Sequence, residues 1–307
     1  MKAVRIHEFG DSDVLTLEET PKPVLHDGEI LIKVRAASIN PVDCKIRSGS
    51  FKKVDTKLPA TLGRDVAGVV EAVGKGVSGT KPGDDVYAFL GYDSGGYAEY
   101  AIAKPQEVAP MPAAVDYVHA AAVPLAAITA WQGLFDHGKL QVGQRVLIHG
   151  AAGGVGHYAV QFAKAKGATV FATAGKEDAT MLKQIGADEV IDYQNERFED
   201  KARDIDLVLD LVGGDTQRRS WAVLKPGGRL ISTLEQPSAE QARARHAEGK
   251  VFMAQAKAEQ LREIGKLIDA DKVTVLVEKT LPLDQAREAH DTLENQHVRG
   301  KLVLTVS

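Results

Sequence analysis

Cysteine is almost absent from this chain: Cys44 is the only one in 307 residues. A single thiol excludes an intramolecular disulfide, and it also excludes a structural zinc site built from three or four thiolates. A chain of this length buries enough surface to fold without a disulfide or a metal. At ~150 residues per domain, the length predicts about two domains.

An excess of basic residues and long apolar runs are also missing. The net charge of -4 argues against a general nucleic-acid binder or a protein of anionic membrane surfaces. The N-terminal segment has no apolar core of signal-peptide length. The longest uncharged stretch, Tyr117–Phe135, contains polar residues and Pro124, so it predicts a buried helix that Pro124 kinks or starts, not a membrane span. We therefore expect a cytoplasmic protein that binds neither nucleic acid nor membrane.

Aromatic residues make up only 6% of the chain, whereas glycine is plentiful at 29 residues. This composition suits an α/β protein with many tight turns. Before Asp116, short β-type runs at Glu29–Ala36, Ala67–Val73 and Asp85–Phe89 are separated by glycine and proline. This spacing predicts a small, mostly β domain.

From Gln144 onward, strand and helix patterns alternate. The strands are short and rich in Val, Ile and Leu, as in a parallel sheet that is covered on both faces. The charged run Gln241–Lys250 is expected to be a solvated surface, with a substrate-side loop as the alternative. The predicted strands are Arg145–His149, Thr169–Thr173, Glu189–Asp192, Asp206–Leu211, Arg229–Thr233, Val273–Val277 and Lys301–Val306, and the predicted helices are Val155–Ala165, Ala179–Ile185 and Ala254–Ala270.

Three glycines at three-residue spacing follow the first of these strands and precede a helix. A dinucleotide-binding turn needs such glycines because the turn is tight, the backbone approaches a pyrophosphate, and helix and strand pack closely. The N–H groups and the dipole of the helix then bind the anion. An ordinary glycine-rich turn is the alternative. The expected cofactor contacts are Gly150, Ala152, Gly153, Gly154, Val155 and Gly156.

The end of the second strand favours NADP(H) over NAD(H). An NAD site usually has Asp or Glu about 20 residues beyond the glycines. Here that position is Thr173, and Lys176 follows, so a neutral hydroxyl and a cation suit a 2′-phosphate. Glu177 and Asp178 beside Lys176 weaken this inference, and a plain surface lysine is the alternative.

Two further candidates follow the third and fourth strands at the same carboxyl edge, where ligands bind in such sheets. Tyr193 is a candidate for contact with the adenosine phosphate, or else a tyrosine of the rim. Leu211 precedes Gly213 and Gly214, and glycines there let a cofactor lie close to the backbone.

The sequence resembles the medium-chain dehydrogenases/reductases, and most closely their zinc-independent quinone oxidoreductase branch. The matching stretches span nearly the whole chain in the family's order. They are Ala36–Asp43, Leu62–Gly68, Gly95–Tyr100, Gly150–Gly156, Leu224–Gly228 and Gly300–Leu304.

This resemblance implies an α/β fold in which a Rossmann domain, with a doubly wound parallel sheet, is inserted into a GroES-like, mostly β domain. The GroES-like substrate domain would comprise residues 1–122 and 273–307, and the Rossmann domain residues 123–272. Nicotinamide and substrate would lie in a cleft between the two. The resemblance also implies a homodimer formed by extension of the Rossmann sheets.

The sequence departs from the zinc-dependent relatives of this family. Those have Gly-His-Glu where this chain has Gly63-Arg64-Asp65, and their four-cysteine lobe is replaced by the short stretch Phe89–Gly96. Cys44 without a neighbouring histidine cannot form a three-ligand Cys/His site. We therefore predict no metal site, and without a Lewis acid we expect no efficient oxidation of simple alcohols.

The chemistry that then fits is hydride transfer from NADPH to a quinone or an α,β-unsaturated carbonyl compound. By resemblance, Asn40 would bind the nicotinamide ribose or the substrate carbonyl, and Thr129 would lie near the cofactor. Asp43 and Tyr92 are further candidates for the cleft, with Tyr92 as a proton donor or a wall. The alternatives are a turn residue for Asn40, a structural acceptor for Asp43, a solvated loop residue for Tyr92 and a self-bonded helix threonine for Thr129.

Two other functions stay open at this point. One is an NADPH-dependent reductase of enoyl thioesters, which would act on a larger substrate. The other is a protein that binds NADPH without turnover, because function depends on the site and not on the fold.

Overall fold

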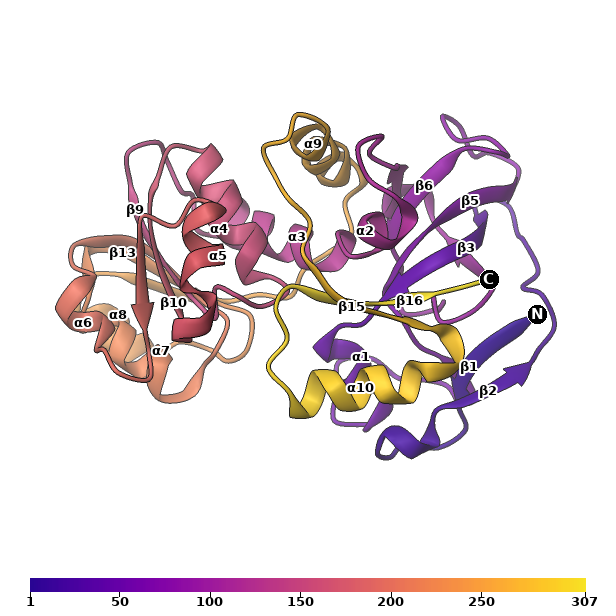
Figure 1. Cartoon of the computed structure of the whole chain (residues 1–307), viewed down its shortest axis with the longest axis horizontal. Coiled ribbons are helices and arrows are strands. Elements are labelled where there is room, and N and C mark those ends of the chain that lie inside the picture. The colour runs from indigo at the N-terminus through magenta and orange to yellow at the C-terminus, as the bar shows by residue number, and fades with distance from the viewer. The chain divides into compact units, whose positions relative to one another are not determined.

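The computed structural model describes all residues from Met1 to Ser307 and contains two compact units (Figure 1). Unit 1 comprises Met1–Ala126, Ala256–Asp271 and Val275–Ser307, and unit 2 comprises Ala127–Gln255 and Lys272–Thr274. The expected insertion at residues 123–272 differs from unit 2 chiefly at Ala256–Asp271. None of the helices combines the length and the apolar character that crossing a bilayer requires.

Unit 2 contains a parallel six-stranded sheet in the order β11-β10-β9-β12-β13-β14. Numbered along the unit, this is the order 3-2-1-4-5-6 of a doubly wound Rossmann fold, as expected. All residues of β12 are buried, because helices cover both faces of such a sheet. The strands are β9 (Arg145–His149), β10 (Thr169–Ala174), β11 (Glu189–Asp192), β12 (Ile205–Asp210), β13 (Leu224–Ser232) and β14 (Glu248–Val251).

The helices of unit 2 alternate with these strands. Helix α3 (Pro124–Trp131) begins in unit 1 and continues into unit 2. Pro124 is its first residue, where the missing N–H costs no hydrogen bond, and a π-helical turn (Gln132–His137) follows. The other helices are α4 (Gly156–Ala165), α5 (Ala179–Gln184), α6 (Phe198–Lys201), α7 (Gly214–Ser220) and α8 (Ala239–Ala244).

Unit 1 contains a seven-stranded sheet in the order β15-β16-β3-β5-β6-β8, with β7 also paired to β3, and a small sheet β2-β1-β4. The C-terminal strand β16 pairs antiparallel with β3, so the end of the chain completes the N-terminal sheet, as the resemblance implied. The strands are β1 (Lys2–Ile6), β2 (Thr16–Glu19), β3 (Ile30–Ser38), β4 (Ala60–Thr61), β5 (Asp65–Val73), β6 (Asp85–Phe89), β7 (Tyr100–Ala103), β8 (Val108–Pro110), β15 (Val277–Pro282) and β16 (Lys301–Thr305).

The helices of unit 1 cover this sheet, and its core joins apolar residues of the N-terminal strands to those of β16 and α10. The predicted helix at Tyr117–Phe135 is divided, because α2 ends at Ala121 and α3 begins only at Pro124. The helices are α1 (Pro41–Arg47), α2 (Tyr117–Ala121), α9 (Ala258–Asp269) and α10 (Ala286–Asn295).

The predicted strand Val273–Val277 is wrong, because β15 begins only at Val277. Val273 and Val275 are buried and Thr274 between them is exposed, which imitates the alternation of a strand. The partner of this segment is a side chain and not a strand. The N–H of Thr274 donates to Oε1 of Gln161 at 2.7 Å, and its carbonyl accepts from Nε2 at 3.0 Å.

Strand β14 begins at Glu248 within the charged run Gln241–Lys250, ends just beyond it at Val251, and was not predicted. It forms the edge of the sheet and pairs with β13, and its residues alternate between exposed and half-buried. An edge strand with charged side chains resembles a solvated surface in sequence, because only one of its sides is bonded.

Helix α9 packs on unit 1, although its sequence follows the Rossmann strands. Leu261, Ile264 and Ile268 form its buried stripe. The hydroxyl of Tyr87, on β6, donates to the carbonyl oxygen of Leu261 at 2.5 Å, and burial raises the pKa of Tyr87. A buried phenol that bonds the helix backbone fixes α9 to this sheet.

A buried histidine, His149, ends the central strand β9 of unit 2. The hydroxyl of Ser220 donates to the carbonyl of Thr216 at 2.6 Å, so its oxygen accepts from Nε2 of His149 at 2.9 Å. Nδ1 of His149 then accepts from the hydroxyl of Thr173 at 3.0 Å. Burial lowers the pKa of His149 to about 4, so the ring is neutral at physiological pH.

Replacing Tyr87 by Phe should lower the free energy of unfolding by about 1–3 kcal/mol, because the carbonyl of Leu261 loses its buried donor. Urea unfolding followed by circular dichroism measures this change. Tyr193→Phe is the matched control, since 63% of Tyr193 is exposed, and its stability should stay within experimental error. Equal stabilities for the two variants would contradict the role given to Tyr87.

His149 should make the protein less stable in acid. The pKa of His149 in the folded protein, about 4, lies below its unfolded value near 6.5. The free energy that the neutral ring contributes to folding is therefore complete above pH ~6.5 and is lost as the pH falls toward 4. The loss is on the order of 3 kcal/mol. Unfolding free energies of His149→Gln between pH 4.5 and 7.5 should show a shallower acid slope than the wild type. The exposed His26, changed to Gln, should keep the wild-type slope.

Candidate functional site: a glycine turn and a buried polar network

The glycine turn joins β9 to α4 at a distance that admits no side chain. A Cβ atom added to Gly156 would lie 2.2 Å from the carbonyl oxygen of Gly150 and 2.6 Å from Cα of Ala151. Gly150 has a φ of 68°, which favours glycine. The backbone from Ala152 to Val155 therefore leads directly into the N-terminus of α4. This terminus is the positive end of the helix dipole, where an anion binds.

Leu211 lies beside this turn. A Cβ atom added to Gly150 would be 3.6 Å from Cβ of Leu211 and 3.3 Å from Cγ2 of Val212. Buried Asp210 fixes the loop, because its Oδ1 accepts the N–H groups of Val212 and Gly213 at 3.1 and 2.8 Å. The structure therefore brings together the ends of β9 and β12, as the sequence predicted.

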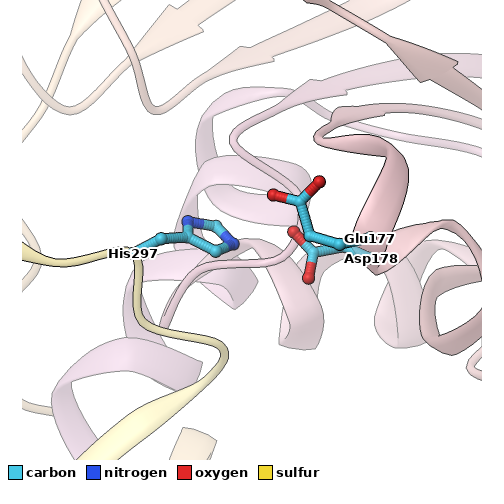
Figure 2. Close-up of side chains that lie close together, drawn as sticks. All are labelled: Glu177, Asp178 and His297. Carbon is cyan, nitrogen blue, oxygen red and sulfur yellow. The ribbon is translucent and has the colours of Figure 1, made fainter.

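Lys176 and Tyr193 follow the two neighbouring strands at the same edge. Lys176 is exposed and begins the 3-10 turn Lys176–Asp178, on which Figure 2 shows the side chains of Glu177 and Asp178. The N–H of Tyr193 donates to the carbonyl of Ala174 at 3.2 Å, which places Tyr193 beside the end of β10.

Thr173 and Thr129 are less accessible than expected. Thr173 is buried, and its hydroxyl proton is used by His149, so only a lone pair of its oxygen is left for a cofactor. Thr129 lies in the middle of α3 and is buried as well. The part of either residue in cofactor binding stays a prediction.

Asn40 belongs to a buried cluster in unit 1. Its Nδ2 donates to Oδ2 of Asp65 at 2.8 Å, and its Oδ1 accepts from Nζ of Lys301. Asp65 also accepts from the hydroxyl of Ser38 at 2.8 Å. Burial raises the pKa of Asp65 and lowers the pKa of Lys301. One amide hydrogen of Asn40 remains after these contacts.

Sequence reasoning missed Asp65 and Lys301 as members of this cluster. Both occur in stretches that carry the family resemblance, Leu62–Gly68 and Gly300–Leu304. A charged residue next to an apolar strand run was the available signal, but it did not reveal that β5 and β16 both flank β3.

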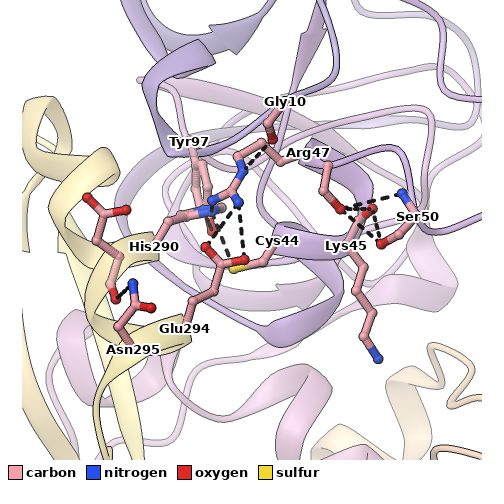
Figure 3. A network of polar contacts seen from close by, with 11 residues as sticks. Gly10, Cys44, Lys45, Arg47, Ser50, Tyr97, His290, Glu294 and Asn295 are labelled. Carbon is pink, nitrogen blue, oxygen red and sulfur yellow. Dashed lines mark hydrogen bonds and ion pairs between the residues drawn. The ribbon is translucent and has the colours of Figure 1, made fainter.

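Asp43 is connected to the helix α10 by a directed chain of hydrogen bonds, of which Figure 3 shows Arg47, His290, Tyr97 and Glu294. Arg47 has only donors, so Nδ1 of His290 accepts from its Nη1 at 3.1 Å. Nε2–H of His290 donates to the hydroxyl oxygen of Tyr97 at 3.3 Å, and Tyr97 donates to Oδ2 of Asp43 at 3.3 Å. Glu294 binds Arg47 at 3.0 Å and completes the chain.

Burial sets the ionisation of the members of this chain. Burial raises the pKa of Asp43 to about 6. Burial, with a smaller effect of the Arg47 cation, lowers the pKa of His290 to about 3, so the ring is a neutral link. Oδ2 of Asp43 also accepts the N–H of Asn40 at 2.9 Å, whereas Oδ1 has no hydrogen-bond partner. Asp43 thus acts as a structural acceptor through Oδ2.

The expectation that Cys44 has no neighbouring histidine is wrong. Its Sγ lies 3.4 Å from Nδ1 of His290, because α1 and α10 pack together (Figure 3). The pair still does not suit zinc. Burial raises the pKa of Cys44 to about 12, and Arg47 directs a cation at the same histidine nitrogen. Arg64, in place of the relatives' histidine ligand, donates to the carbonyl oxygens of Gly91 and Ser94.

Tyr92 is neither deeply buried nor freely solvated. Its side chain is 37% exposed, and its ring stacks on Phe51 with centroids 5.8 Å apart. The guanidinium carbon of Arg64 lies 5.0 Å from the ring centroid. Burial raises the pKa of Tyr92, so the phenol keeps its proton at neutral pH.

Comparison with known proteins matches both parts of the chain. The family model described as an alcohol dehydrogenase GroES-like domain matches residues 26–113, and that of a zinc-binding dehydrogenase matches residues 185–304. The quinone oxidoreductase of Rattus norvegicus is 34% identical over 99% of this chain and 97% of its own length.

Two solved structures are similar over the whole chain. The quinone oxidoreductase from Coxiella burnetii has a TM-score of 0.93 and 39% identity, and the alignment covers 100% of this chain and 99% of that one. The Escherichia coli quinone oxidoreductase complexed with NADPH has a TM-score of 0.89 and 28% identity, with both chains covered completely. The chain therefore belongs to the medium-chain dehydrogenase/reductase superfamily and, within it, to the quinone oxidoreductase branch.

Proposed function

We propose that this oxidoreductase transfers a hydride from NADPH to quinones or to α,β-unsaturated carbonyl compounds, without zinc. The observation that carries the proposal is the glycine turn. Gly156 in this turn admits no side chain. The chain that contains the turn matches a quinone oxidoreductase over 99% of the chain's length. We assign cofactor binding to unit 2 and substrate binding to unit 1.

The preference for NADPH is supported by the edge of the Rossmann sheet. The structural neighbour from Escherichia coli was solved with NADPH. Here Lys176 and Tyr193 are exposed at the ends of neighbouring strands, where they would bind the 2′-phosphate. The pyrophosphate would lie on the amides of residues 150–156, beside Leu211. Thr173 would contribute an oxygen lone pair, and Thr129 would lie near the cofactor.

The residues of the chain would position the reactants and leave the chemistry to the nicotinamide. NADPH, when bound, supplies the hydride. Conjugated acceptors suit a site without a Lewis acid, because conjugation spreads the negative charge that forms. The remaining amide hydrogen of Asn40 is the group proposed to bind the ribose or the carbonyl oxygen. Asp43 would hold the N-terminus of α1 in place, and Tyr92 would form a wall.

Assembly and location remain proposals as well. We propose that the chain forms a homodimer, since one side of the edge strand β14 has no strand partner in the sheet order. We also propose that the protein is located in the cytoplasm. The partners of the site would be small molecules, and neither nucleic acid nor membrane is expected to bind.

Purified protein should oxidise NADPH when 9,10-phenanthrenequinone, 1,4-benzoquinone or a 2-alkenal is added, because each accepts a hydride at a conjugated carbon or carbonyl. The loss of absorbance of the nicotinamide band measures turnover. Ethanol with NADP⁺ is the control and should give no rate. Binding of NADPH without turnover of any acceptor would favour the binding protein, and turnover of enoyl thioesters alone would favour the thioester reductase.

Lys176→Ala should weaken NADPH binding by ~1–3 kcal/mol and leave NADH nearly unchanged, because only NADPH carries the 2′-phosphate. Fluorescence titration of both cofactors measures the two dissociation constants. Lys183→Ala, an exposed lysine of α5, is the matched control and should change neither. Equal losses for NADPH and NADH would remove Lys176 from the phosphate site.

A further inference from the structure

Asp210, the last residue of β12, holds two loops at the carboxyl edge of the Rossmann sheet. Its Oδ1 accepts the N–H groups of Val212 and Gly213 in the loop that follows β12. Its Oδ2 accepts from Nε2 of Gln217 at 3.0 Å and from the hydroxyl of Ser232, the last residue of β13, at 2.8 Å. Asp210 is fully buried, so water does not compete for these four hydrogen bonds.

The loop that follows β13 is tied to the same carboxylate through two of these partners. Oγ of Ser232 accepts the N–H of Leu234 at 3.2 Å. Nε2 of Gln217 also donates to the carbonyl oxygen of Glu235 at 3.2 Å. The side chain of Glu235 returns to the start of α7, where its Oε1 accepts the N–H of Gly214 at 2.6 Å. The two loops therefore form one hydrogen-bonded unit around a single carboxylate.

Each loop carries an apolar side chain that remains exposed. Val212 is 50% exposed and Leu234 is 46% exposed. A Cβ atom added to Gly213 would lie 3.3 Å from Cδ1 of Leu234, and one added to Gly150 would lie 3.3 Å from Cγ2 of Val212. An apolar surface thus begins beside the dinucleotide turn and continues over both loops.

The strand order determines which half of a dinucleotide reaches this surface. In the function proposed above, the 2′-phosphate lies at the end of β10 and the pyrophosphate on the turn after β9. Strand β12 lies on the opposite side of β9 from β10, and β13 follows it. A dinucleotide that crosses the carboxyl edge of this sheet therefore brings its nicotinamide half to the loops after β12 and β13.

We propose that Asp210 is a positioning residue for NADPH, and that it acts through Val212 and Leu234, against which the nicotinamide half of the cofactor lies. This inference rests on the proposed function. Asp210 is buried and would act without touching the cofactor. By holding both loops in place before NADPH binds, it reduces the conformational entropy that binding would otherwise lose.

Adenosine 2′,5′-bisphosphate separates the two halves of the cofactor, because it contains the adenosine and phosphate groups but no nicotinamide. Asp210→Asn replaces one acceptor oxygen by an amide that donates. The side chain of Gln217 can then no longer satisfy this position and the carbonyl oxygen of Glu235 at once. Titration calorimetry of the full chain should show that NADPH binds about five-fold more weakly or worse, whereas the bisphosphate stays within about two-fold of the wild type.

Asp206→Asn is the matched control. Asp206 is a buried residue near the opposite end of β12, and its Oδ2 accepts the N–H of Arg145 at 2.8 Å. Its replacement should lower the stability and leave both affinities within about two-fold of the wild type. Equal losses of NADPH and bisphosphate in Asp210→Asn would indicate a general disturbance of unit 2 and overturn the positioning role, as would undiminished binding of NADPH.

Leu234→Ser decides the matter if Asp210→Asn does not fold, since an exposed side chain contributes little to the core. NADPH should again bind about five-fold more weakly, with the bisphosphate unchanged. Val142→Ser removes an equally apolar side chain, 73% exposed, just before the start of β9 and should change neither affinity. Wild-type affinity of Leu234→Ser for NADPH would overturn this inference alone. A wild type that bound neither ligand would overturn the proposed function together with the inference.

Discussion

The contact between Gly156 and the carbonyl of Gly150 is the constraint on which the nucleotide half of the molecule depends. Any side chain at Gly156 would overlap the backbone of the turn, so α4 would have to move away from β9. The start of α4 would then no longer lie over the ends of the central strands. The loop after β12, beside Gly150, keeps its place through Asp210. Close packing thus serves the fold and the anion site at once.

In unit 1 the corresponding constraint is polar. Asn40 joins Asp65 to Lys301, and these residues come from three parts of the chain that meet around β3. Charges buried at such a junction are stable only when each finds its partners, so the cluster fixes the register of the strands as well as the start of α1.

The sequence predicted the regular parts of this structure well. The strands at Arg145–His149, Asp85–Phe89 and Glu189–Asp192 are confirmed to the residue, because apolar runs bounded by glycine or charge leave little choice of boundary. Elements whose partner is distant or unusual were predicted poorly. The edge strand β14 carries charges, and α9 packs against β6 and β8, which lie more than a hundred residues earlier in the chain.

The candidate site shows the same division. The glycine turn is a local pattern, so its residues were found together with the neighbouring Leu211. The proximity of His290 to Cys44 and of Lys301 to Asn40 was not found, because both pairs join residues separated by more than 240 positions. No local pattern encodes such contacts. The packing of α10 on α1 creates the first, and the pairing of β16 with β3 creates the second.

The contact of Gln161 with Thr274 has a consequence for the modularity of the fold. Gln161 is buried, and both ends of its amide bond the backbone of Thr274, which belongs to the short later segment Lys272–Thr274 of the same unit. A nucleotide-binding module produced as one continuous piece, residues 127–255, would still bury the Gln161 amide but would lack the backbone of Thr274 that it bonds. Transferring this unit to another protein therefore requires both of its segments, Ala127–Gln255 and Lys272–Thr274. A recombinant that received only the first would contain a buried amide oxygen of Gln161 without its hydrogen-bond donor.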